Sequence, residues 1–180
     1  LSVSPAKPEL VFAVIESEKS ALYRSENKGN SWTKMNDSPE MGARPFYFSF
    51  LLADPVDTNR VYKPGYYLSY SEDGGKTFKP TYVAGGNVHS DIHPIWISQK
   101  DPSLMYAGTD GGLYISNDRG NSWRFVRTLP VSQFYHVSAD NKKPYNVYGG
   151  LQDNGSWMAP SKSPGGIENK DWQNVGGGDG

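Results

Sequence analysis

Three short stretches of this sequence decide its fold: residues 25–32 read SENKGNSW, residues 71–78 read SEDGGKTF and residues 116–123 read SNDRGNSW. Each fits the pattern Ser-x-Asp/Asn-x-Gly-x-Ser/Thr-aromatic. The aromatic residues that end them follow one another after 46 and 45 residues, and a fourth aromatic, Trp172, comes 49 residues later without the rest of the pattern. A repeat of this length predicts an array of similar supersecondary units.

The repeated box has a physical explanation as the turn of a hairpin. Its Asp or Asn accepts backbone N–H groups of the turn, its Gly supplies a positive φ, and its Ser or Thr ties the loop across. The aromatic residue then anchors the turn in the core. We therefore assign a structural role to Ser25, Asn27, Gly29, Trp32, Ser71, Asp73, Gly75, Phe78, Ser116, Asp118, Gly120 and Trp123.

Short alternating runs surround each box and predict β-strands. Residues 112–116, GLYIS, are one example, and polar-plus-Pro turns such as Asp54-Pro55 precede others. No stretch has helical periodicity. Each unit reads as four antiparallel strands, and units of this size that cannot bury both faces alone are typical of β-propeller blades. We expect an all-β fragment of a larger propeller, with blades at roughly 1–40, 41–85, 86–130 and 131–180.

The composition excludes several classes of function. The chain has 180 residues, and its 18 basic and 19 acidic residues leave a net charge of −1, which gives no electrostatic footprint for nucleic acid. The absence of Cys removes disulfides, thiolate zinc sites and cysteine nucleophiles. No apolar run approaches the about 18 residues of a membrane span.

The boxes resemble the Asp-box (BNR) repeats of sialidases, xyloglucanase-type glycoside hydrolases and the sortilin propellers. The later half resembles the sortilin-like or BNR-repeat glycosyl hydrolases of secreted bacterial proteins, through residues 89–97 (HSDIHPIWI), 108–116 (GTDGGLYIS), 145–157 (YNVYGGLQDNGSW) and 176–180 (GGGDG). This resemblance implies seven or more blades, so that the remaining blades of the same propeller would be partners of this piece. It also implies a secreted, cell-surface or periplasmic protein.

In propellers of this kind, the start of each innermost strand and the turn between the second and third strands face the same mouth of the channel. We expect ligand-binding residues there. The positions that satisfy this rule are Arg44, Tyr47, His89, Asp91, His93, Gln133, Tyr135, Gln152, Asp153 and Asn154.

His89, Asp91 and His93 stand at alternate positions, which on an extended strand share one face. Imidazole and carboxylate groups in that arrangement can hold a divalent metal, the one cofactor that the sequence suggests. The alternative is that they bond neighbouring blades around the channel mouth.

Four carboxylates, those of Asp91, Asp110, Asp153 and Asp179, form the candidate catalytic set. Glycoside hydrolysis needs two carboxyl groups about 5–10 Å apart, one of them protonated. The alternative is that these Asp residues only bond the backbone of Gly-flanked turns.

Three functions remain open. The first is a propeller that binds a polypeptide or glycan ligand without catalysis. The second is a glycoside hydrolase of the xyloglucanase type that uses paired Asp residues. The third is a structural scaffold in a surface assembly. Because no nucleophile–base motif is recognisable, binding is favoured over catalysis.

Overall fold

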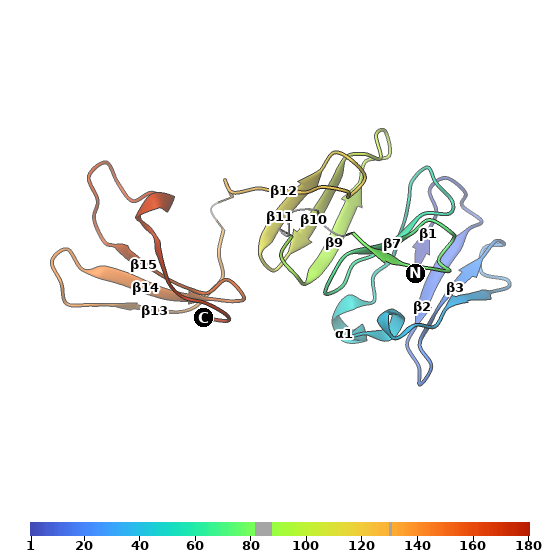
Figure 1. The fold of residues 1–180 in the computed structure, drawn as a ribbon, viewed down its shortest axis with the longest axis horizontal. Helices are drawn as coiled ribbons and strands as arrows, with labels where there is room; N and C mark the ends of the chain where they lie inside the picture. Colours follow the sequence, from blue (N-terminus) through green and yellow to red (C-terminus); the bar gives the residue numbers. More distant parts are fainter. Residues whose placement is uncertain (82–87, 130) are drawn as a thin grey trace. The chain divides into compact units, whose positions relative to one another are not determined.

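The computed structural model describes residues 1–81, 88–129 and 131–180, and it divides the chain into two compact units, Leu1–Val126 and Arg127–Gly180. The described strands form four antiparallel sheets of four strands each, and within each sheet the strands are neighbours in chain order (Figure 1). The expected all-β class is therefore confirmed. The boundary expected at residues 85 and 86 between the second and third blades lies outside the described residues.

The first unit contains three of the sheets. The first sheet is β1 (Ser2–Val3), β2 (Val11–Ile15), β3 (Ala21–Ser25) and β4 (Thr33–Asn36). The second is β5 (Leu52–Ala53), β6 (Val61–Lys63), β7 (Ser69–Ser71) and β8 (Lys79–Pro80). The third is β9 (Ile92–Ile97), β10 (Met105–Thr109), β11 (Gly112–Ser116) and β12 (Arg124–Phe125).

The second unit contains the fourth sheet. Its strands are β13 (Phe134–Ala139), β14 (Asn146–Leu151), β15 (Ser156–Pro160) and β16 (Gln173–Gly176), and a single turn of 3-10 helix, η2 (Asn169–Asp171), precedes the last strand. Trp172, the fourth repeated aromatic, directly follows η2, and its ring lies 6.4 Å from that of Phe134. The box pattern is therefore replaced here by a different connection.

The sheets of the first unit stack through alternate faces of their strands. Side chains of Phe12 and Leu22 on the first sheet meet Val61 on the second in one buried cluster. The neighbouring residue on β6, Tyr62, points to the opposite face and joins Met105 of the third sheet in a second cluster. This follows from the period of two in a strand, which sends successive side chains to opposite faces.

Each box closes the turn between the third and fourth strands of its sheet. In the second box, Ser71 Oγ accepts the N–H of Gly75 at 2.8 Å, and Asp73 accepts the N–H of Thr77 at 2.9 Å and its hydroxyl at 2.7 Å. The Gly75 φ of 95° fits glycine best. Burial alone would raise the pKa of Asp73, but these hydrogen bonds outweigh it and hold the pKa well below its usual range.

The box aromatics differ in burial. Phe78 packs against the first cluster and Trp123 against the second. Trp32 is 41% exposed, and the atoms nearest to the open side of Gly29 all belong to this ring. The first box therefore anchors its aromatic residue mainly on its own loop.

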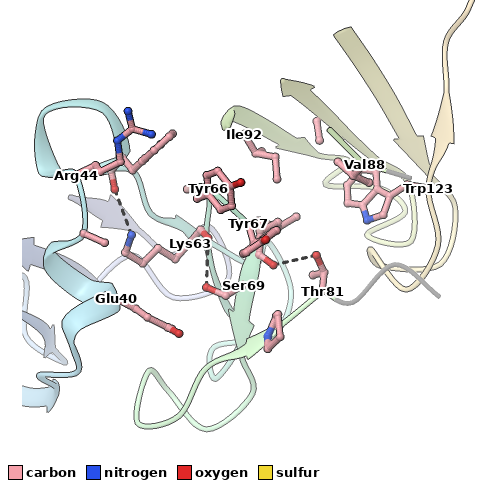
Figure 2. A pocket seen from close by; sticks show the side chains of 16 residues that line it. Glu40, Arg44, Lys63, Tyr66, Tyr67, Ser69, Thr81, Val88, Ile92 and Trp123 are labelled. Carbon is pink, nitrogen blue, oxygen red and sulfur yellow. Dashed lines mark hydrogen bonds between the residues drawn. The ribbon is translucent and has the colours of Figure 1, made fainter. Parts of the chain in front are cut away.

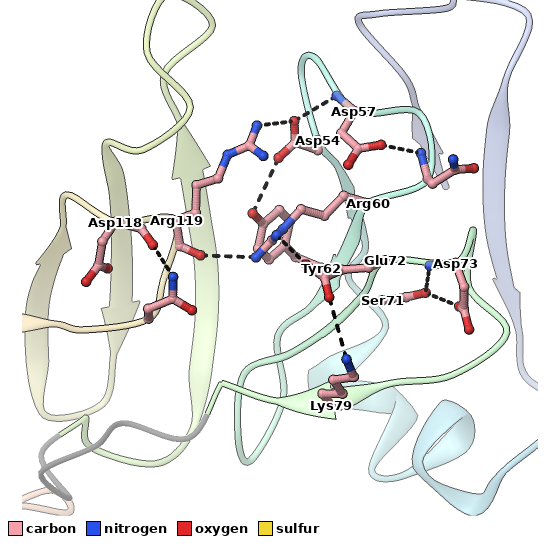
Figure 3. Close-up of polar contacts among 12 residues, drawn as sticks. Asp54, Asp57, Arg60, Tyr62, Ser71, Glu72, Asp73, Lys79, Asp118 and Arg119 are labelled. Carbon is pink, nitrogen blue, oxygen red and sulfur yellow. Dashed lines mark hydrogen bonds and ion pairs between the residues drawn. The ribbon is translucent and has the colours of Figure 1, made fainter.

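A polar network joins the second and third sheets. Asp54 is fully buried; its Oδ1 lies 3.4 Å from Arg119 Nη2, and Tyr62 donates its hydroxyl to Oδ2 at 3.4 Å (Figure 3). Arg60 donates to the Arg119 carbonyl at 3.3 Å and to Glu72 at 2.9 Å. Burial, opposed by Arg60 and assisted by Asp54, raises the pKa of Tyr62 to about 12.

The link between the first and second sheets contains helix rather than the expected strand. It holds a 3-10 turn, η1 (Pro39–Gly42), and one turn of α-helix, α1 (Pro45–Phe48). The prediction that Arg44 and Tyr47 start an inner strand was therefore wrong. Arg44 adopts a left-handed conformation with φ 45°, and Pro45 fixes the φ of the first helical residue, which together begin a helix at this point.

Candidate functional site

A cavity of about 510 Å³ lies in the first unit, where three segments meet. Helix α1 and the residue before it contribute Arg44 and Phe48, the turn after β6 contributes Tyr66 and Tyr67, and β9 begins beside it at Ile92 (Figure 2). The start of β9 is a position at which the sequence placed ligand binding, whereas Tyr66 and Tyr67 of the β6–β7 turn were not among the predicted residues. This volume is within the range of small-molecule sites.

Much of the lining of the cavity is apolar. This apolar part comes from Phe48, Leu68, Val88, Ile92, Ala107 and Trp123. Since apolar surface is stabilised by removal from water, a ligand with an apolar part gains free energy by filling this space. The cavity therefore suits an amphiphilic group better than a fully hydrated one.

Exposed aromatic rings line the cavity and occur on the helix beside it. Tyr66 and Tyr67 are 50% and 67% exposed, and their ring centroids lie 4.6 Å apart at nearly a right angle. Helix α1 exposes a second pair, Phe46 and Tyr47, with centroids 5.1 Å apart. Neighbouring exposed aromatic side chains mark interaction surfaces in soluble proteins.

Arg44 brings charge to this surface. Its guanidinium lies over the rings of Tyr47 and Phe48, at 5.7 Å from each centroid, and its Nη1 is 3.5 Å from Asp91 Oδ1. The structure thus brings together three residues that the sequence proposed for binding, although Tyr47 lies on α1 and not on a strand. The Asp91 carboxylate also accepts the hydroxyl of Ser90 at 3.0 Å.

A second pair of candidate residues also meets. His93 Nε2 lies 3.0 Å from Asp110 Oδ1, and both side chains are about one-third exposed. The His93 ring lies 5.5 Å from that of Phe48. The backbone N–H of Asp110 donates to the carbonyl of Asp91 at 3.3 Å, so the two loops that carry these acids are directly bonded.

The expectation that His89, Asp91 and His93 share one strand face was wrong. Asp91 has a φ of 60°, and β9 begins only at Ile92, so the alternation of an extended strand does not reach back to His89. The imidazole of His89 instead lies 3.0 Å from the Ser90 carbonyl through Nδ1. In residues 1–81, 88–129 and 131–180, no three His, Asp or Glu side chains converge to hold a metal ion.

Lys63 is a site residue that the sequence reasoning missed. It ends β6, is only 4% exposed, lines the cavity and donates from Nζ to the carbonyl of Phe48 at 3.2 Å. Burial lowers the pKa of Lys63, while the Glu40 carboxylate opposes that shift. A Lys at the end of an apolar strand gave no signal, because its burial depends on α1, which the sequence did not predict.

The other candidate residues lie in the second unit. Gln152 donates its N–H to the carbonyl of Gln133 at 3.0 Å, which sets the turn after β14 beside the start of β13. Asp179 Oδ1 accepts the N–H of Asp153 at 3.2 Å, and its Oδ2 lies 3.5 Å from the Tyr135 hydroxyl. Asn154 donates from its side chain to the Gln152 carbonyl at 2.8 Å.

The four candidate catalytic acids are therefore divided equally between the units. Asp91 and Asp110 lie in the first unit and Asp153 and Asp179 in the second. The Asp91 carboxylate is paired with Arg44, and the Asp179 carboxylate accepts the backbone N–H of Asp153. Asp110 likewise contacts His93. Each of these three carboxylates is therefore held in place by a polar neighbour.

Comparisons with known proteins identify the class of fold. No protein-family model matches this sequence and no curated protein matches it. Among solved structures, a GH74 enzyme from Niastella koreensis is 15% identical over 97% of this chain, with a TM-score of 0.54. A GH74 xyloglucanase from Xanthomonas campestris is 16% identical over 97%, and an ancestral GH74 enzyme 18% identical over 97%, each with a TM-score of 0.54.

The chain spans less than a third of these proteins, covering 29%, 30% and 23% of their lengths. At this level of identity the likeness shows the fold. The four sheets therefore correspond to part of a larger β-propeller of the Asp-box class.

Proposed function

We propose that this chain is part of a propeller that binds a polypeptide or glycan ligand at the cavity beside α1, without catalysis. The proposal is supported by the largely apolar cavity and by the exposed rings of Tyr66 and Tyr67 in its lining. Such rings give large contact area at a small cost in conformational entropy, because each has only two side-chain dihedrals. Secretion, which the resemblance implies, is part of the same proposal.

Binding to arrays of glycans and peptides, followed by titration of the strongest hits, tests this function. The double variant Tyr66→Ala/Tyr67→Ala should lower affinity at least about tenfold, since a contact aromatic at the centre of an interface contributes about 2 kcal/mol or more. Tyr145→Ala is the matched control, because Tyr145 is 49% exposed and lies in the second unit. Equal losses in both variants, or no hit at all, would refute the proposal.

The hydrolase alternative has one observation in its favour, the bonded loops of Asp91 and Asp110. Against it, the Asp91 carboxylate is paired with Arg44 and the Asp110 carboxylate with His93, whereas hydrolysis requires one acid to protonate the leaving group. Release of reducing ends from xyloglucan by the wild-type chain, abolished in Asp91→Asn, would support this alternative. The scaffold alternative predicts that neither ligand array gives a hit.

A further inference from the structure

Lys63 places a buried ammonium group at the wall of the cavity. The three residues of β6, Val61, Tyr62 and Lys63, are all buried, and Lys63 is 4% exposed. Burial of a charged amine costs several kcal/mol unless the charge is compensated. A Lys at such a position therefore calls for a compensating group.

The residues that the structure describes supply only part of that compensation. An ammonium has three N–H donors, and the Lys63 Nζ uses one on the neutral Phe48 carbonyl, 3.2 Å away (Figure 2). Among the described residues, none of the ion pairs within 4.0 Å includes Lys63. Glu40 also lines the cavity, and it acts on Lys63 from beyond that distance.

The ammonium can be reached from the cavity. Both Lys63 and Gly65 line it, and a Cβ added at Gly65 would lie 3.9 Å from Lys63 Nζ. The missing side chain of Gly65 therefore leaves open the space beside the charge. Apolar residues such as Leu68 and Ile92 line the same cavity.

We propose that Lys63 binds the carboxylate of a ligand whose apolar part, an aryl or alkyl group, fills the adjoining cavity. This inference rests on the proposed function and names the chemical class of its ligand. A carboxylate supplies the missing opposite charge, and the attraction is strong because water is excluded from the buried ammonium. We favour a carboxylate over a phosphate dianion because Arg44, the other cation among the described residues that line the cavity, is already paired with Asp91 and leaves Lys63 to bind the ligand.

The test compares two probes of equal shape, 3-phenylpropionate and its neutral analogue 3-phenylpropionamide, by titration calorimetry and ligand-observed NMR on the full chain. Wild type should bind the acid at least about tenfold more tightly than the amide. Lys63→Met keeps the length of the side chain and removes the charge. In this variant the acid and the amide should bind with about equal affinity, and the affinity for the amide should stay as in wild type. An unchanged preference in Lys63→Met would overturn the inference.

A second variant keeps the ammonium and blocks its approach. Gly65→Val adds bulk beside Nζ and should weaken both probes at least about fivefold, with a melting temperature close to that of wild type; unchanged binding would contradict the inference. This variant decides the matter if Lys63→Met does not fold. A purely structural Lys63, holding only the Phe48 carbonyl, predicts loss of thermal stability in Lys63→Met with no change in the ratio of the two affinities.

The outcomes also separate this inference from the proposed function. Equal binding of acid and amide by wild type would refute the role of Lys63 and leave a ligand-binding cavity. Failure of both probes would count against both. Glucuronate, a carboxylate on a hydroxylated ring, should bind more weakly than 3-phenylpropionate, and tighter binding of glucuronate would overturn the assignment of an apolar ligand.

Discussion

Replacement of Asp54 should destabilise the first unit more than any other change in the network between the second and third sheets. The fully buried Oδ1 of Asp54 accepts the N–H groups of Val56 and Asp57, each at 3.0 Å. Hydrogen bonds to charged groups contribute about 1.5–3 kcal/mol each, so Asp54→Ala, which removes two, should lower the free energy of unfolding by about 3–6 kcal/mol. The contacts to Arg119 and Tyr62 are long, at 3.4 Å, and add little.

Urea unfolding, followed by far-ultraviolet circular dichroism, measures this change. With a slope of about 2 kcal/mol/M, the midpoint should fall by about 1.5–3 M. Asp54→Asn retains a carbonyl acceptor for the turn and should cost less than Asp54→Ala. Arg119→Met removes a side chain that is 32% exposed and should cost at most about 1 kcal/mol.

We expect the stability that Asp54 contributes to come from its turn and not from its ion pair with Arg119. A loss in Arg119→Met as large as that in Asp54→Ala would refute this expectation, because the ion pair would then carry the energy. A loss below about 1 kcal/mol in Asp54→Ala would refute it equally, since two buried N–H groups would have lost their acceptor without consequence.

Three further predictions concern other parts of the chain. Trp123→Ala should cost about 3 kcal/mol in chemical unfolding, whereas Trp32→Ala, at a ring 41% exposed, should cost about 1; similar losses would contradict the difference in packing. His89→Ala should move stability by less than about 1.5 kcal/mol, because the bond from its backbone N–H to a Tyr hydroxyl survives, and a larger loss of thermal stability would show otherwise. Backbone hydrogen bonds, above all, lower the pKa of Asp140 to about 2. Its contribution to the free energy of unfolding is therefore complete above the unfolded pKa of about 3.9 and disappears as pH falls toward 2. Unfolding midpoints measured across this pH range should drop less in Asp140→Asn than in wild type.

The repeated boxes allowed the sheets to be predicted from local chemistry. The Ser, Asp and Gly of residues 71–78 make their hydrogen bonds within one turn, so their roles follow from spacing alone. The contact between Asp54 and the third sheet could not be predicted in this way. The N–H partners of Asp54 are local, but its contact with Arg119 joins it to a box turn 65 residues away.

The candidate site was predicted only where backbone geometry is regular. Asp110 was expected in the turn after its strand and lies between β10 and β11. The sequence placed Arg44 and Tyr47 at the start of an inner strand, whereas the left-handed Arg44 begins a helix there. Lys63 was missed for the same reason, because it donates to the Phe48 carbonyl of α1, a helix that the sequence did not predict.

The variable position before the box glycine has a wider consequence. Residues 28, 74 and 119, which are Lys, Gly and Arg, all adopt positive φ, yet only the third reaches across to another sheet through its side chain. Boxes with the same sequence pattern therefore differ in the contacts that they make with the neighbouring sheet. Shuffling the repeats within the gene would keep the turn bonds of each box but separate Arg119 from Asp54, so the third box is matched to its neighbouring sheet in a way that the other two are not.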